Sequence, residues 1–271
     1  MKLTSLMRIW LTRSFKPFEF NSHNDHTLDF EEIGQLGLYV HIPFCRSICS
    51  FCPYCKVQYD PLLAEKYEQS LLKEIELIGR TLTKPKEVTS LYLGGGTPAL
   101  MLDSIKKIID ALKRYFVIQG GIGAELHPDD VDDEVLMKLK EAGVTMISIG
   151  IQSFHSGCLS ALGRKEPDYE RIFKAVGKTG FETVDMDLIF AIPGQTADIL
   201  KSDIDTAFKN GATQISTYPF IDFTFADNRY KPLSEQVKKK MLAEITAHCQ
   251  ERNYRRTSVW TFAKPGTGKY S

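Results

Sequence analysis

Short runs of apolar and β-branched residues alternate with amphipathic stretches from Leu38 onward. The runs have the length and composition of strands that are buried on both faces. Each run is followed by a segment whose apolar residues recur at helical spacing. Such alternation is typical of a parallel sheet. The sequence predicts strands at residues 38–42, 89–93, 123–126, 145–151, 183–190 and 214–220.

Helical signals separate these strands. Asp60 is a suitable N-cap before Pro61, and an apolar stripe then continues to Ile78. A second stripe covers residues 105–116, and a third covers 131–142 and stops at Gly143. Further helices are expected at 168–179, 197–210 and 233–252, before a final strand near 256–262.

Strand–helix units of roughly 30 residues predict an α/β fold, a partial (βα)6 TIM-type barrel that remains open. In such a barrel the loops at the carboxyl ends of the strands carry the chemistry. We expect an N-terminal extension at residues 1–35, a core domain at 36–222, and the start of an incomplete carboxyl-terminal region at 223–271.

The first residues form a basic amphipathic segment. Four basic residues precede the first acidic one, Glu19, and five apolar residues share one helical face: Leu3, Leu6, Met7, Trp10 and Leu11. We expect this helix to dock on its own domain through the apolar stripe. A transit peptide and a membrane-surface helix remain alternatives.

Charge and cysteine usage narrow the class of protein. Lys plus Arg and Asp plus Glu both number 34 in 271 residues, so no basic field points to a nucleic-acid partner. No apolar run of about 18 residues predicts a transmembrane helix. Four of the six cysteines fall within eleven consecutive residues, which favours metal ligation over disulfides and indicates a reducing, cytoplasmic location.

The clustered cysteines follow the first predicted strand directly. Cys45, Cys49 and Cys52 have C-x3-C-x2-C spacing on one loop. Three thiolates can hold three irons of a [4Fe–4S] cubane and leave the fourth iron without a protein ligand. An open coordination position is a reactive one, as in catalytic zinc sites. A structural zinc site that adds Cys55 is the alternative, and Cys55 itself has no assigned role.

Three segments carry a family resemblance: residues 39–52 (YVHIPFCRSICSFC), 94–98 (GGGTP) and 149–153 (IGIQS). They resemble the oxygen-independent coproporphyrinogen III oxidase family of radical S-adenosylmethionine (SAM) enzymes. The resemblance implies a [4Fe–4S] cluster, one or two SAM molecules and a one-electron reductant such as flavodoxin or ferredoxin. It also implies cleavage of SAM to a 5′-deoxyadenosyl radical and oxidative decarboxylation of a tetrapyrrole substrate.

The resemblance assigns site residues position by position. It makes Cys45, Cys49 and Cys52 the cluster ligands, and it implies a set of SAM partners: Tyr39, Phe51, Gly95, Gly96, Thr97, Glu125, Gln152, Arg164 and Asp187. Their types suit those roles, since glycines permit close backbone approach, carboxylates accept from ammonium or ribose groups, and an arginine grips a carboxylate. No catalytic residue beyond these is assigned.

Some positions leave the family branch open. The oxidase pattern has an extra cysteine two positions after the third ligand, whereas Cys55 stands three positions after it. Haem chaperones and radical SAM methyltransferases share the same core motifs, so both remain alternatives. Asp185 shares a strand face with Asp187, so either carboxylate can be structural. We expect His41 to be a buried strand histidine with a backbone partner, or a residue that tunes the cluster.

Overall fold

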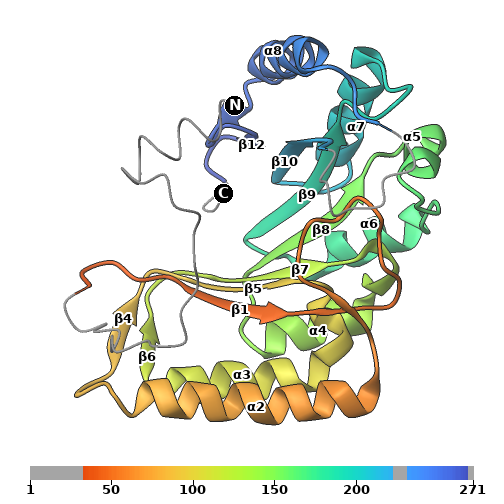
Figure 1. Cartoon of the computed structure of the whole chain (residues 1–271). Helices are drawn as coiled ribbons and strands as arrows, with labels where there is room; N and C mark the ends of the chain where they lie inside the picture. The colour runs from red at the N-terminus through yellow and green to blue at the C-terminus, as the bar shows by residue number, and fades with distance from the viewer. Residues whose placement is uncertain (1–32, 222–230, 268–271) are drawn as a thin grey trace, which may run out of the picture. The chain divides into compact units, whose positions relative to one another are not determined.

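The computed structural model describes residues 33–221 and 231–267 (Figure 1). The chain divides into two units, Met1–Ile33 and Gly34–Ser271, and the fold below belongs to the second. The predicted amino-terminal helix, which includes Trp10, lies outside the described residues. No helix in the described ranges combines the length and the apolar character needed to cross a bilayer.

One curved sheet forms the centre of this unit, in the order β1-β5-β7-β8-β9-β10-β12-β11. Its first six strands run parallel: β1 (Leu38–Ile42), β5 (Leu91–Gly95), β7 (Ile122–Leu126), β8 (Met146–Gln152), β9 (Thr183–Phe190) and β10 (Gln214–Pro219). β12 (Thr261–Ala263) and β11 (Arg255–Arg256) extend it antiparallel. β1 and β11 are its two edges among the described strands, so the sheet is the open, partial barrel that the sequence predicts.

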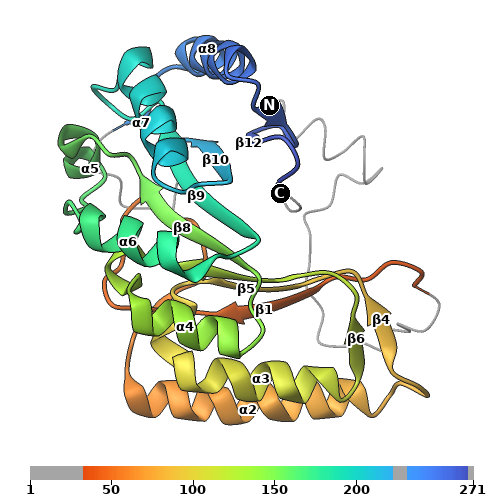
Figure 2. The same cartoon turned by 180° about the vertical axis from the view of Figure 1, so that it is seen from behind.

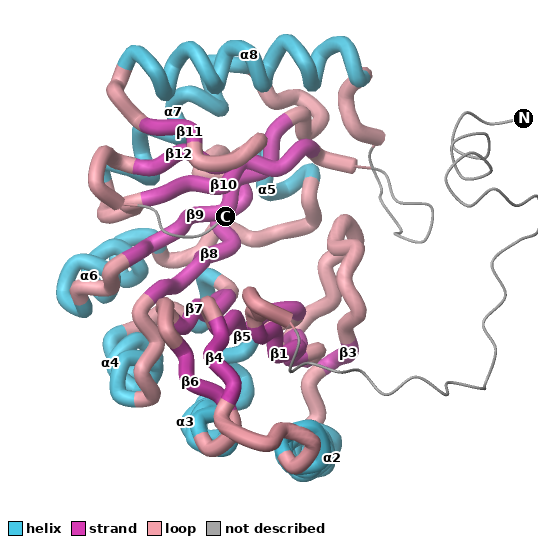
Figure 3. The backbone as a smooth tube through the Cα atoms, turned by 90° about the vertical axis from the view of Figure 1, so that its left-hand side faces the viewer, coloured by secondary structure: helices cyan, strands magenta, loops and turns pink. Residues whose placement is uncertain are grey.

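Helices cover the outer side of the sheet, as Figures 2 and 3 show. They are α2 (Pro61–Gly79), α3 (Leu102–Lys113), α4 (Asp133–Glu141), α6 (Tyr169–Thr179), α7 (Ala197–Lys209) and α8 (Glu235–Glu251), with the short α5 (Ser156–Ala161) after β8. Asp60 caps α2 as expected, because its side chain accepts from the Leu63 amide at 2.8 Å.

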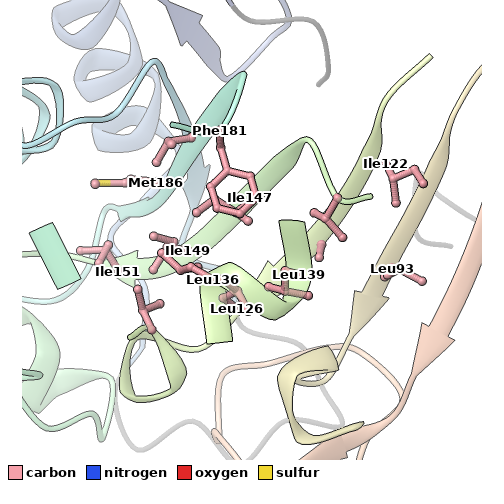
Figure 4. Packing of buried hydrophobic residues seen from close by; sticks show 14 of the residues in the cluster. Leu93, Ile122, Leu126, Leu136, Leu139, Ile147, Ile149, Ile151, Phe181 and Met186 are labelled. Carbon is pink, nitrogen blue, oxygen red and sulfur yellow. The ribbon is translucent and has the colours of Figure 1, made fainter. Parts of the chain in front are cut away.

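Side chains of β8 show that one face of the sheet packs in the hydrophobic core and the other carries polar residues. Ile147, Ile149 and Ile151 are buried in the cluster that contains Leu136 and Leu139 of α4 (Figure 4). Because side chains alternate along a strand, the residues between them face the inner side of the sheet. The inner side is polar: the register aligns Glu125, Ser148, Asp185 and Gln214 in one row across four strands.

Several predicted boundaries were wrong. β5 runs two residues past the predicted end, because its pairing with β1 includes Gly94 and Gly95, glycines that sequence propensity excludes from strands. The predicted 105–116 helix ends at Lys113, and Phe116 begins β6 (Phe116–Ile118), which pairs with β4 (Lys86–Val88). The last predicted strand, 256–262, is instead the separate strands β11 and β12.

Candidate functional site

The cysteine loop between β1 and α2 is closed mainly by its own backbone. β2 (Phe44–Cys45) pairs in parallel with β3 (Val57–Gln58). The Tyr59 amide donates to the Cys45 carbonyl at 2.8 Å, and the Cys52 amide donates to the Cys49 carbonyl at 3.3 Å. These bonds bring the first and last parts of the loop together at the carboxyl end of β1.

The thiols of Cys45, Cys49 and Cys52 lie near one another on this loop. All three are half-buried and free, whereas the free thiol of Cys55 is exposed. Burial raises the pKa of Cys45, and the neighbouring Cys52 and Cys49 raise it further. Burial also raises the pKa of Cys49, while the nearby Arg164 guanidinium opposes the rise. Three such thiolates disfavour one another unless cations join them.

The described residues around this loop do not form a binding site for a single metal ion. Among residues 33–221 and 231–267, no three His, Cys, Asp or Glu side chains gather as ligands of one metal ion. A cubane differs from such a site because each of its cysteine ligands binds a different iron.

Glycines at the end of β5 bring the site together. The Gly96 amide donates to the Ile42 carbonyl at 2.7 Å, and a Cβ on Gly96 would lie 2.4 Å from the Phe44 carbonyl oxygen. Gly95 has φ +116°, and a Cβ there would lie 2.4 Å from the His41 ring. Only glycine tolerates these close contacts and the positive φ. The two glycines therefore allow the end of β5 to lie directly against the backbone that leads to Cys45.

Glu125 lies across these glycines. Its carboxylate accepts from the Gly95 amide at 2.8 Å, and a Cβ on Gly94 would meet its Oε1 at 2.9 Å. Burial raises the pKa of Glu125, against the lowering effect of the Gly95 amide and of a hydrogen bond from Tyr92. The half-buried carboxylate therefore keeps unused acceptor capacity beside these glycines.

Asp187 and Asp185 extend the carboxylate row along β9. Asp187 accepts from the Ser148 hydroxyl at 2.8 Å, and burial followed by repulsion from Asp185 raises its pKa. Asp185 accepts from the side chains of Gln214 and Ser216, each at 2.7 Å. Asp185 is thus tied to the neighbouring strand β10, while Asp187 lies within the electrostatic reach of Glu125.

Tyr39 and His41 lie on β1, within the electrostatic reach of Glu125. The Tyr39 hydroxyl and His41 Nδ1 are 3.0 Å apart, and His41 Nε2 donates to the Cys55 carbonyl at 2.9 Å. The histidine has the backbone partner expected from the sequence, although it is half-buried rather than buried. Through this bond it links β1 to the far end of the cysteine loop.

Gln152 and Arg164 close the β8 side. The Gln152 Nε2 lies 2.8 Å from where a Gly150 Cβ would be, and Arg164 donates to the Gly150 carbonyl at 3.3 Å. The buried Arg164 Nε has no hydrogen-bond partner among the described residues. Since Arg164 also acts on the pKa of Cys49, these groups lie next to the cysteine loop.

Phe51 belongs to an apolar group beside this edge. It packs against a small buried cluster formed by Cys158, Leu162, Ile189, Ile192 and Phe220. Sequence reasoning missed this cluster, and it missed Tyr92 and Ser148 as partners of the two carboxylates. The alternation of inward-facing positions along each strand was the signal that would have found Tyr92 and Ser148.

Comparison with known proteins identifies the superfamily. The Radical SAM superfamily model matches residues 39–207. The chain is similar to the Heme chaperone HemW of Bacillus subtilis (strain 168), with 35% identity over 190 residues, 68% of this chain and 50% of the relative. It is also similar to the oxygen-independent coproporphyrinogen III oxidase of Cereibacter sphaeroides (strain ATCC 17025), with 29% identity over 243 residues, 85% of this chain and 54% of the relative.

A solved structure gives the same result for the fold. Coproporphyrinogen III oxidase (HemN) from Escherichia coli, described as a radical SAM enzyme, matches with a TM-score of 0.77 and 27% identity, over 86% of this chain and 56% of that one. The chain thus spans about half the length of these relatives. The cofactors of the matched superfamily, and hence of this chain, are a [4Fe–4S] cluster and SAM. On the strength of a match that covers more than half of its residues, the chain belongs to the radical SAM superfamily.

Proposed function

We propose that this chain is a coproporphyrinogen III oxidase-like radical SAM enzyme that acts on a tetrapyrrole substrate. In this proposal Cys45, Cys49 and Cys52 hold the cluster. The observation that carries it is that Cys49, one of three neighbouring thiols, lies near Arg164, whose buried Nε has no hydrogen-bond partner among the described residues. Glu125 and Gln152 lie at the same edge of the sheet.

The donor set fits the two cofactors. Burial raises the pKa of the Cys45 and Cys49 thiols, and binding to iron offsets this cost by stabilising the thiolates. The glycine run leaves backbone open for close approach of a small molecule. The buried Arg164 Nε, which nothing in residues 33–221 and 231–267 hydrogen-bonds, suits a carboxylate. When bound, the cofactors supply one-electron cleavage of a carbon–sulfur bond and a hydrogen-abstracting carbon radical.

Each remaining residue has a binding or orienting task. Glu125 and Asp187 accept hydrogen bonds from the ammonium and hydroxyl groups of SAM, and Arg164 binds its carboxylate. Tyr39, Phe51 and Thr97 complete the contact surface between β1, the loop and β5. Phe51, which is partly buried against an apolar cluster, helps to keep water from the nucleoside side of the site.

The tetrapyrrole substrate rests on the relatives. The oxidases of C. sphaeroides and E. coli match 85% and 86% of this chain, and both act on coproporphyrinogen III by name. A haem chaperone is the second candidate function, because the B. subtilis HemW match has the higher identity, 35%. A one-electron donor such as flavodoxin or ferredoxin is the partner that either cluster-dependent activity requires.

Anaerobic reconstitution tests the proposal. Protein reconstituted with iron and sulfide, reduced with dithionite and supplied with SAM should form 5′-deoxyadenosine, and it should convert coproporphyrinogen III to protoporphyrinogen. The Cys49→Ala variant is the control and should form neither product. Haem binding without protoporphyrinogen would favour the chaperone. S-Adenosylhomocysteine together with methyl transfer would instead favour a methyltransferase, and absence of 5′-deoxyadenosine would contradict the proposal.

A further inference from the structure

The end of β8 has an unusual backbone conformation. Gln152 has φ +70°, and the Ser153 amide donates to the Ile151 carbonyl at 2.9 Å. A hydrogen bond across three residues with a positive central φ is the rare, strained form of the γ-turn. The pairing of β8 with β9 is also irregular between Ile149 and Gln152. A glutamine in this conformation must be held by its surroundings.

Asp203 of α7 is what holds the turn. Its Oδ2 accepts from the Ser153 hydroxyl at 2.6 Å, and its Oδ1 accepts from the Phe154 amide at 2.9 Å. The Ser153 hydroxyl in turn accepts from the His155 amide at 3.1 Å. Tyr169 of α6 adds a bond from its hydroxyl to the Ser153 carbonyl at 3.1 Å. Two helices of the outer layer, α6 and α7, which lie beside β8 in Figure 2, therefore hold the backbone directly after Gln152 through these bonds.

A buried carboxylate is a costly way to attach a helix to a strand. Asp203 is 2% exposed and Ser153 is 0% exposed. Burial raises the pKa of Asp203, against the lowering effect of its bonds to Ser153 and Phe154. An apolar residue would pack the same contact without that desolvation cost. The cost and the strained turn occur at the same place, which indicates a role beyond packing.

The turn decides where the Gln152 amide lies. In the observed conformation its Nε2 lies over Gly150, the residue whose carbonyl accepts from Arg164. An amide can both donate and accept, so beside a guanidinium it complements a ligand that carries carboxylate and hydroxyl groups. Relaxation of φ at Gln152 to a strand value would swing this amide away from Arg164.

We propose that Asp203 is a positioning residue for SAM, which acts through Ser153 and Phe154 to hold the γ-turn that presents the Gln152 amide beside Arg164. This inference rests on the proposed function, in which Gln152 and Arg164 contact SAM. Asp203 itself does not touch the ligand, so its effect on affinity passes through Gln152.

A double-mutant cycle on SAM affinity tests this coupling. Binding is measured anaerobically on cluster-loaded wild type, Asp203→Asn, Gln152→Ala and the double variant. Asp203→Asn replaces one acceptor oxygen by an amide that cannot accept, so we expect SAM binding about tenfold weaker, the size of one lost buried polar interaction. In the Gln152→Ala background the same change should have no further effect on affinity.

Asp205 provides the matched control on the same helix. It binds His248 of α8 and Arg252, the residue that follows α8, away from β8. Asp205→Asn should lower the stability of the fold and leave SAM affinity within twofold of wild type. Hydrogen exchange of the protein without cofactors gives a second readout: Asp203→Asn should expose the Ser153 and Phe154 amides to faster exchange, and Asp205→Asn should not.

The outcomes are distinguishable. Unchanged SAM affinity in Asp203→Asn, or the same weakening with and without Gln152, overturns the inference while the proposed function stands. Wild-type protein that holds a cluster and binds no SAM overturns both. If Asp203→Asn does not fold, Ser153→Ala replaces it, because it removes one of the two donors to Asp203. Ser153→Ala should weaken SAM binding in the wild-type background and have no further effect on SAM affinity in the Gln152→Ala background. If Ser153→Ala weakens SAM binding equally in both backgrounds, the inference is overturned.

Discussion

The two sides of the site are built differently. The cysteine loop is held largely by bonds within itself, and its Ile48 and Tyr54 side chains are 49% and 62% exposed. The end of β8 is held by a buried network from α6 and α7, with Ser153 and Asp203 almost fully buried. In our account the cysteine loop takes its final geometry when its three cysteines bind the cluster, because metal sites gain order from their ligand bonds. The second side is preorganised by the protein alone.

Besides the His41 bond to the Cys55 carbonyl, an ion pair ties the loop to the start of the segment after β7. Arg46, next to Cys45, places its Nε and Nη2 atoms 2.9 and 2.8 Å from Asp130 Oδ1. Asp130 is buried, whereas the Arg46 side chain is 66% exposed. An exposed arginine gives a tie of modest strength, which fits a loop that takes its final geometry with its cluster.

Loss of a cluster ligand should produce the largest effect, and it should affect the cysteine loop and leave the end of β8 unchanged. Cys45→Ala, Cys49→Ala and Cys52→Ala should each abolish the absorbance near roughly 400 nm that is expected of a thiolate-bound [4Fe–4S] cluster. Cys55→Ala is the control and should keep it, because the exposed Cys55 is not one of the three proposed ligands. Equal loss in Cys55→Ala would indicate a four-thiolate site.

Gly96→Ala should give the next largest effect, a loss of stability of the fold at the end of β5. Its Cβ would lie 2.4 Å from the Phe44 carbonyl oxygen, so the backbone before Cys45 must move. We expect a loss of about 3 kcal/mol in the free energy of unfolding, measured by urea titration. Gly177→Ala in α6 has open space around its Cβ and should raise stability by about 1 kcal/mol. A neutral Gly96→Ala would contradict the close approach.

The sequence was sufficient to predict the fold and the place of Cys45, Cys49 and Cys52 on one loop after the first strand, but not the support of β8. Buried runs such as 183–190 predict strands directly, because alternation with amphipathic helices leaves few other folds. The strands β2, β3, β4 and β6 have only two or three residues each, too short for any periodicity to emerge. The γ-turn was missed because glutamine, unlike glycine, carries no signal for a positive φ. Asp203 was missed because its partners lie about 50 residues away in sequence.

Glu125→Gln, a change on β7 between the two sides, should weaken SAM binding and leave the iron content unchanged. The amide keeps one acceptor for the Gly95 amide but loses the charge that a SAM ammonium or hydroxyl group would meet. Charge-assisted bonds are stronger than neutral ones, so we expect affinity about tenfold lower by equilibrium dialysis. Loss of iron in this variant would mean that Glu125 is structural.

Asp187→Asn should have the smallest effect, a gain in stability for the protein without cofactors. Burial raises the folded-state pKa of Asp187 above the ordinary value of 3.8, so the folded protein holds this proton more tightly than the unfolded chain does. The free energy of unfolding therefore falls as pH rises through the pKa of Asp187 in the folded protein, and the full cost of the buried charge is present above that pKa. Asn removes the penalty.

The gain should be a rise in Tm of about 3 °C at neutral pH, and it should vanish below pH 3.8. Thermal unfolding followed by circular dichroism at several pH values checks this dependence. SAM affinity should fall in the same variant, so that stability and binding move in opposite directions. A variant less stable than wild type at neutral pH would show that Asp187 serves the fold instead.

The most direct test of the central claim is the electron paramagnetic resonance spectrum of the reduced, anaerobically reconstituted protein before and after addition of SAM. Three thiolates that leave one iron open predict a [4Fe–4S] signal whose shape changes when SAM binds, with no such signal in Cys49→Ala. Protein that retains only zinc, or a cluster signal that SAM leaves unchanged, would contradict the account.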